Sequence, residues 1–119
     1  MAKRSSIQNT SDTLFAEGHT QALNLLRQCS SSSGFLASLT EHDNYRRIWA
    51  RDGVISGLAA LLSGEDDLIN TFKQTLLTLA HYQGPHGEIP SNVDTISERV
   101  SYGGTTGRID ADLWFVVGC

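Results

Sequence analysis

The positions of hydrophobic residues along the chain predict a pair of helices in its middle. Residues 52–63 are almost free of charge, so a helix over this range would be apolar nearly all round and covered on most sides. Ser63-Gly64 ends that helix, and acidic residues at 65–67 open another, which continues to about residue 82 with one apolar face. The short connection predicts an antiparallel helical hairpin with an inner, apolar helix and an outer, amphipathic helix.

One further helix is predicted before this hairpin. Residues 1–10 are polar and predict a loose tail. A helix over about 11–29 follows, capped by Ser11 or its neighbour, with several apolar residues near one face. Four serines and a glycine at 30–34 stop that helix, and we interpret them as a turn inside one domain. Residues 35–48 then form an irregular or short extended approach to the hairpin.

The pattern disappears after the hairpin, where glycines and prolines in residues 83–108 break any helix. Loops of this length in compact domains are usually functional or disordered, and apolar residues such as Ile89 and Val93 favour an ordered loop over a site. A fourth helix then starts with Asp110 as its N-cap, and its body is again nearly all apolar. Because no partner helix follows, we expect the chain to be the front portion of a longer polypeptide.

Together these elements predict an all-α fold of antiparallel helical hairpins with a long ordered loop. Residues 1–119 would form a single unit, with residues 1–10 as its loose tail. There is no strand-rich section and no repeat by residue identity. The alternation of inner helix, outer helix, loop and inner helix is nevertheless a structural period.

Charge and cysteine content narrow the functional classes. A formal net charge of −4 argues against nucleic acid as a partner, because no basic face is available to release counterions. The apolar runs are too short to span a membrane, and we do not expect the first residues to be a secretory signal, because no apolar region follows Lys3 and Arg4. Cys29 and Cys119 lie far apart and read as reduced thiols of a cytoplasmic protein. His81 and His86 lack a metal-like set of partners, so we expect neither metal nor cofactor.

The stretch from Trp49 to Asp52 is the main candidate for chemistry. A planar ring, a guanidinium and a carboxylate at the start of a helix suit a small polyhydroxylated ligand, because the two charged groups can pair with vicinal hydroxyls. The structural alternative is an Asp52 that caps the helix, an Arg51 paired to it and a Trp49 in the core. From these residues alone, the structural alternative is ahead.

Three segments, in this order and spacing, resemble the six-hairpin glycoside hydrolases. They are YRRIWARD at 45–52, LLSGE at 61–65 and GRIDADLWF at 107–115. The chain is most similar to bacterial relatives of amylo-α-1,6-glucosidase, the glycogen debranching enzyme, and it is also similar to neutral/alkaline invertases. The resemblance covers roughly residues 35–119. It implies that the chain is the N-terminal portion of an (α/α)6 toroid and that its function is hydrolysis of an α-glucosidic bond.

The resemblance also implies roles for individual residues. Arg51 and Asp52 would bind hydroxyls of the terminal sugar, and Trp49 would help wall the pocket. Asp110 occupies the position of the family's general acid, while no residue here matches the catalytic base. Inverting hydrolysis of this kind separates the two carboxyl groups by about 6.5–9.5 Å. From sequence alone, Asp110 is as well explained as a plain N-cap.

The neighbouring candidates have structural alternatives too. Arg108 could orient Asp110 or simply pair with it. Tyr102 and the glycines after it could shape a subsite or form a mere turn. Asp112 is expected to be solvated, and Trp114 to be core.

The preferred interpretation is a debranching-type α-1,6-glucosidase fragment that is inactive alone, with an α-glucan as its partner. The alternatives are a sucrose-cleaving, invertase-like enzyme, a catalytically incomplete carbohydrate-binding fragment, and a helical interaction domain. The proposed site requires Asp52 and Asp110 to point into one pocket. Uncovered apolar faces on the helices at 52–63 and 110–119 also predict a homo-oligomer.

Overall fold

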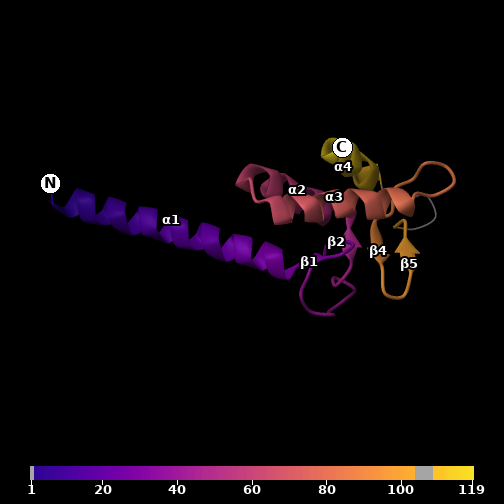
Figure 1. Ribbon diagram of the computed structural model, residues 1–119, viewed down its shortest axis with the longest axis horizontal. Coiled ribbons are helices and arrows are strands. Elements are labelled where there is room, and N and C mark those ends of the chain that lie inside the picture. Colours follow the sequence, from indigo (N-terminus) through magenta and orange to yellow (C-terminus); the bar gives the residue numbers. More distant parts are fainter. Residues whose placement is uncertain (1, 104–108) are drawn as a thin grey trace.

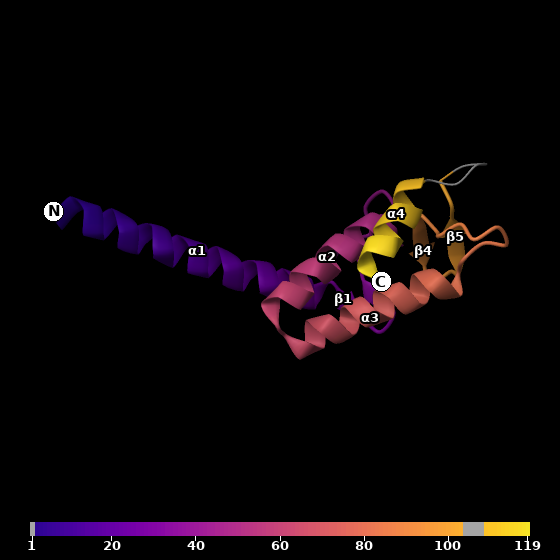
Figure 2. The ribbon, with the colours of Figure 1, turned by 90° about the horizontal axis from the view of Figure 1, so that it is seen from above.

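The computed structural model describes residues 2–103 and 109–119, with side chains from Ile7 onward within the first helix. A long helix projects from a smaller body in which helices and short strands pack together, as Figures 1 and 2 show from two sides. The molecule measures 64 × 26 × 25 Å along its principal axes. The helices are α1 Ala2–Gln28, α2 Ala50–Ser63, α3 Asp66–His81 and α4 Ile109–Gly118.

The predicted all-α fold is wrong, because the described residues also form five short strands in two antiparallel sheets. One sheet pairs β1 with β2, and the other has the order β3-β4-β5. The strands are β1 Ser30–Ser31, β2 Gly34–Phe35, β3 Ile48–Trp49, β4 Asn92–Asp94 and β5 Arg99–Ser101. Strands of two or three residues are too short to show the alternation of apolar and polar residues that reveals a strand in a sequence.

The helical hairpin is confirmed. Gly64 adopts the left-handed conformation at φ 71° and its N–H donates to the carbonyl of Leu61, so it ends α2 in the way that favours glycine. Helix α3 then begins with two acidic residues in its first turn and buries one face. Figure 2 shows α2 and α3 side by side, joined by the short turn.

Two glycines on one face of α2 let the helices of the hairpin approach closely. A Cβ added at Gly57 would lie 2.0 Å from the Phe72 ring, and one added at Gly53 would lie 2.6 Å from the Thr75 methyl group. The core therefore forms around this contact. One buried cluster contains Phe35, Val54, Ala60, Leu68 and Phe72, and Trp114 packs against it as expected. A second contains Ile48, Ala50, Leu79, Ile89 and Ala111.

Helix α2 buries only one face, although its composition predicted cover on most sides. Ile55 and Leu61 are about half exposed, and Leu62 is 91% exposed. Helix α4 likewise exposes Ile109, Leu113, Val116 and Val117. None of the helices in the described ranges is long and apolar enough to cross a membrane.

The predicted loose tail at residues 1–10 is wrong from Ala2 onward, because α1 is helical from that residue. Neither glycine nor proline interrupts residues 2–17, and polar side chains bond along the helix, with Gln8 donating to Asp12 at 3.0 Å. The start of α1 was placed at the first apolar residues, but its N-terminal half is almost wholly exposed. A burial pattern therefore could not mark where this helix begins.

Arg27 joins α1 to the start of α3. Its guanidinium donates to Glu65 at 2.7 Å and to Asp67 at 3.0 Å. The hydrogen bond from Arg27 holds the pKa of the Asp67 carboxyl below its ordinary value. The C-terminal end of α1 is therefore fixed on the body by the ion pairs of Arg27. Leu23 and Leu26 also pack against the core there.

We expect Gly57→Ala to destabilise the protein by about 1–3 kcal/mol, because the new methyl group overlaps the Phe72 ring. This sign is opposite to the gain that Gly→Ala usually gives inside a helix. Urea unfolding measures the change. In a Phe72→Leu background the same substitution should cost less, since the ring atoms are gone. Equal costs in the two backgrounds would show that the overlap is not the cause.

We expect Arg27→Gln to raise the pKa of Asp67 towards its ordinary value of about 3.9, which an NMR titration measures. Since the folded pKa is lowered, the pair's stabilisation is present above pH 3.9 or so and is lost as pH falls through the folded value. Wild-type and variant stabilities should therefore converge in acid. The pKa of Asp94, lowered first by a hydrogen bond from Ser97, should not move. An unchanged Asp67 would contradict this assignment.

Candidate functional site

The start of α2 is held in place by the three-stranded sheet. Ile48 pairs with Val93 and Trp49 with Asn92, and both Ile48 and Val93 are fully buried. The backbone N–H of Ala50 continues the pairing by donating to the carbonyl of Ser91 at 3.0 Å. The first turn of α2 is therefore fixed against a segment some forty residues further along the chain.

Trp49 is oriented by the residues that precede it. Its indole N–H donates to the carbonyl of Asn44 at 3.2 Å, and its ring stacks on Tyr45 with 5.7 Å between centroids and 24° between planes. Arg47 donates to the side chains of Asn92 at 3.1 Å and Asn44 at 3.2 Å. These bonds hold an aromatic pair at the surface beside the start of α2, and half of the Tyr45 side chain is exposed.

Helix α4 is brought against α2 by its own first turn. Ala111 is buried among Ile48 and Ala50, and the Asp112 carboxylate accepts a hydrogen bond from the N–H of Ile89 at 2.6 Å. Asp112 was expected to be solvated; it instead satisfies a buried residue's backbone, since the loop before β4 passes beneath α4. This contact fixes the direction in which α4 begins.

As a result, Arg51 and Asp110 meet. The guanidinium Nη1 of Arg51 lies 3.8 Å from Oδ2 of Asp110, and these side chains are 53% and 44% exposed. The expected N-cap role of Asp110 is wrong, because α4 begins one residue earlier, at Ile109. Its carboxylate lies in the first turn of the helix, where the dipole favours negative charge.

A small cavity of about 10 Å³ lies at this meeting point. It has room for about one water molecule. A sugar could therefore contact these residues only from the open, solvent side. The residues that line it are Trp49, Ala50, Arg51, Ser91, Asp110 and Ala111.

Asp52 does not line this cavity, so the structure does not bring Asp52 and Asp110 together there. Successive residues on a helix point in directions about 100° apart, and Arg51 takes the direction towards α4. Asp52 lies in the groove between α1 and α2. It is not the N-cap of α2 either, since α2 begins at Ala50 with Trp49 as its cap residue.

Tyr102, another predicted sugar contact, does not line this cavity. The hydroxyl of Tyr102 donates to the carbonyl of Tyr82 at 2.8 Å, so it anchors the chain after β5 to the end of α3. Arg108 lies outside the described residues. Two residues of the site were missed, Tyr45 and Ser91. Tyr45 lies in an irregular segment and Ser91 follows a proline, so no local pattern marked them.

The groove that contains Asp52 is larger, at about 440 Å³, and mostly apolar. We call it the α1–α2 groove. Cys29 is one of its lining residues, and burial raises the pKa of the Cys29 thiol. The residues that line it are Ala22, Leu25, Leu26, Cys29, Leu36, Ala37, Asp52, Ile55, Ser56 and Ala59.

No group of three or more histidine, cysteine or acidic side chains within residues 2–103 and 109–119 is arranged to hold a metal ion. Comparison with known protein families, curated proteins and solved structures gives no match to the chain. The evidence for a functional site is therefore the geometry of these residues.

We expect Asp112→Ala to destabilise the protein by about 1–3 kcal/mol, because the N–H of the buried Ile89 loses its acceptor. Asp112→Asn keeps a carbonyl oxygen at that position and should cost clearly less. Urea unfolding of the two variants measures the difference. If both were as stable as the wild type, Asp112 would not be what fixes α4 on the loop.

Proposed function

We propose that the chain binds a terminal sugar unit of an α-glucoside at Trp49, Arg51 and Asp110, as part of a glycoside hydrolase-like protein. The observation that supports this most directly is the contact between Arg51 and Asp110, at 3.8 Å beside the Trp49 ring. Residues that the sequence analysis assigned to one sugar site, and that lie about sixty positions apart, thus line one cavity.

The chemistry of these groups suits a sugar. The Arg51 guanidinium donates hydrogen bonds and the Asp110 carboxylate accepts them, so together they can satisfy the vicinal hydroxyls of a pyranose ring. An exposed ion pair contributes little stability on its own, so exchanging part of it for sugar hydroxyls costs little. The stacked Tyr45 and Trp49 rings supply the apolar face that the carbon-bound hydrogens of a sugar pack on.

Hydrolysis requires two carboxyl groups, and the described residues of this site supply one. Cleavage of a glycosidic bond needs a proton donor and a second carboxylate that directs water or attacks the anomeric carbon. Among the described residues that line the cavity, Asp110 is the one acidic side chain. In our proposal Asp110 is the general acid, the base lies outside residues 1–119, and this chain alone binds sugar without turnover.

A debranching-type α-1,6 linkage is the proposed substrate, with sucrose as the alternative that the invertase resemblance suggests. The proposed location is the cytoplasm, where the free thiols of Cys29 and Cys119 would stay reduced. Because Asp110 is the one carboxylate among the described residues at the cavity, a second interpretation is also favoured, in which the chain is a carbohydrate-binding unit with no hydrolytic role.

The test is an NMR titration that follows the indole N–H of Trp49 as isomaltose, maltose or sucrose is added. We expect isomaltose to shift this signal with a Kd on the order of 1 mM, which corresponds to about 4 kcal/mol. Arg51→Gln and Asp110→Asn should each weaken binding by about tenfold, because each removes one charge-assisted partner of the hydroxyls.

Asp52→Asn is the matched control, because Asp52 follows Arg51 directly but lies in the α1–α2 groove. Its affinity for sugar should equal that of the wild type. Failure of all three sugars to move the Trp49 signal at concentrations on the order of 50 mM would refute the proposed function. If Asp52→Asn lost as much affinity for sugar as Asp110→Asn, the sugar would not bind specifically at Arg51 and Asp110, and the proposed site would be wrong.

A further inference from the structure

Helix α1 projects from the body with large apolar side chains on its surface. It contains 27 residues, and its N-terminal half extends beyond the other elements (Figures 1 and 2). The side chains of Ile7, Leu14 and Phe15 are 66%, 69% and 78% exposed. A lone helix gains most of its stability from packing an amphipathic face, and this half of α1 packs on no other described element. These side chains therefore form an apolar surface that no other described element covers.

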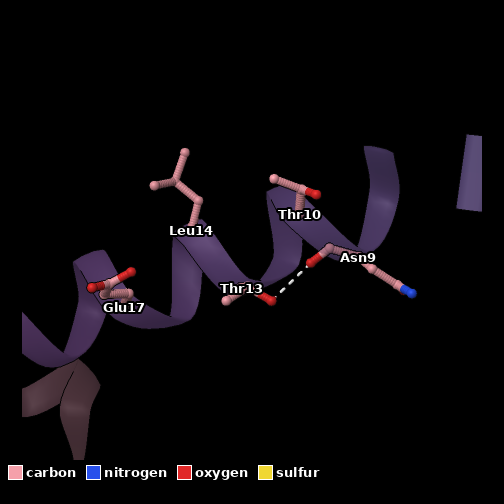
Figure 3. Close-up of a pocket in the computed structure, with 5 residues that line it drawn as sticks. All are labelled: Asn9, Thr10, Thr13, Leu14 and Glu17. Carbon is pink, nitrogen blue, oxygen red and sulfur yellow. Dashed lines mark hydrogen bonds between the residues drawn. The ribbon is translucent and has the colours of Figure 1, made fainter. Parts of the chain in front are cut away.

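Figure 3 shows the N-terminal half of α1 beside this surface. Asn9, Thr10, Thr13, Leu14 and Glu17 surround an open hollow, with the Thr13 hydroxyl donating to the carbonyl of Asn9 at 2.8 Å. All five residues belong to one helix, so the hollow has no second wall and cannot enclose a small ligand. Of these five residues, Leu14 is the one on the face that carries Ile7.

The face of α1 that carries Ile7 and Leu14 leads into the α1–α2 groove. Ala22, Leu25 and Cys29 line the groove and lie on one helical face with Ile7 and Leu14. The opposite wall of the groove is α2, where Ile55 and Ala59 lie four residues apart. Leu62, the next position on that face of α2, is 91% exposed. The groove is thus mostly apolar, and Leu62 continues the apolar surface of its α2 wall.

The spacing of residues on this face of α1 reads the same in both directions. Its members are separated by 4, 3, 4, 4, 3 and 4 residues, centred on Gly18, and span about 33 Å at 1.5 Å per residue. Those members are Ile7, Ser11, Leu14, Gly18, Ala22, Leu25 and Cys29. When two such helices lie antiparallel and cross at Gly18, each large side chain faces a small one. Ile7 then faces Cys29, Ser11 faces Leu25, and Leu14 faces Ala22.

The charges at the two ends of the groove and helix also favour this antiparallel register. Asp52 is the one charged residue among the described residues that line the groove, and it lies at the end where Cys29 is found. The antiparallel arrangement brings the N-terminus of the second α1 to that end. The sequence there carries Lys3 and Arg4, and a helix N-terminus is itself the positive end of the dipole. A basic helix end thus meets an acidic groove end.

We propose that two copies of the chain associate through antiparallel α1 helices, each placing its N-terminal half in the α1–α2 groove of the other. The interface is isologous, so one surface serves both copies. A second copy is the occupant because the groove and the segment that fits it, in spacing and charge, belong to the same chain. This surface lies on the Asp52 side of α2 and is independent of the proposed sugar site.

The first test measures the mass of the full chain by sedimentation equilibrium. We expect a dimer, with Leu14→Glu raising its dissociation constant by more than about tenfold, since symmetry places each altered residue in the interface twice. Ala16→Glu is the control, because Ala16 is exposed on the opposite face of α1 and the charge change is the same. A monomeric wild type, or equal effects of the two variants, would overturn the proposal.

The second test addresses register, in a background where Cys29 and Cys119 are replaced by serine. Gly18→Cys puts a thiol on the two-fold axis, so mild oxidation should give a covalent dimer quickly, whereas Ala16→Cys should not. Equal cross-linking of the two would contradict the antiparallel register. Sugar titration of the Leu14→Glu variant should match the wild type, so failure of the dimer and failure of the sugar site can be told apart.

Discussion

The side chain of Thr75 is the contact on which the body of the molecule depends. It is fully buried on α3, its hydroxyl donates to the carbonyl of Thr71 at 3.0 Å, and it accepts the N–H of Phe35 at 2.9 Å. Cβ atoms added at Gly34 and Gly53 would lie 2.5 and 2.6 Å from it. Strand β2 and helices α2 and α3 therefore meet at one side chain, and a buried hydroxyl with both bonds made favours a single arrangement of the three.

The candidate site follows from this arrangement through two further ties. The β3–β4 pairing fixes the first turn of α2, and the bond from Ile89 to Asp112 fixes the first turn of α4. Arg51 and Asp110 have no direct tie to the core and are about half exposed, yet their backbones are fixed on both sides. A site of this kind keeps its geometry through its backbone, while its charged groups stay free to exchange partners.

The sequence predicted those parts of the fold that depend on local pattern. The hairpin of α2 and α3 was found because Gly64 and the apolar face of α3 are signals that act within a few residues. The strands were missed because Ile48 pairs with Val93, a contact that no local pattern reveals. The proximity of Trp49, Arg51 and Asp110 was anticipated from the family resemblance. Asp52 lines the α1–α2 groove instead, because one step along a helix turns a side chain by about 100°.

The composition of α2 makes physical sense once its different faces are considered together. Gly53 and Gly57 bring α3 close, Arg51 points towards α4, and Asp52, Ile55 and Ala59 face the α1–α2 groove. The buried face of α2 has little room for large side chains, so glycine and alanine dominate it. Its exposed Ile55 and Leu62 are then accounted for by the proposed second copy. The near absence of charge, which first indicated a helix covered on most sides, fits α2 in the proposed dimer better than α2 in a single chain.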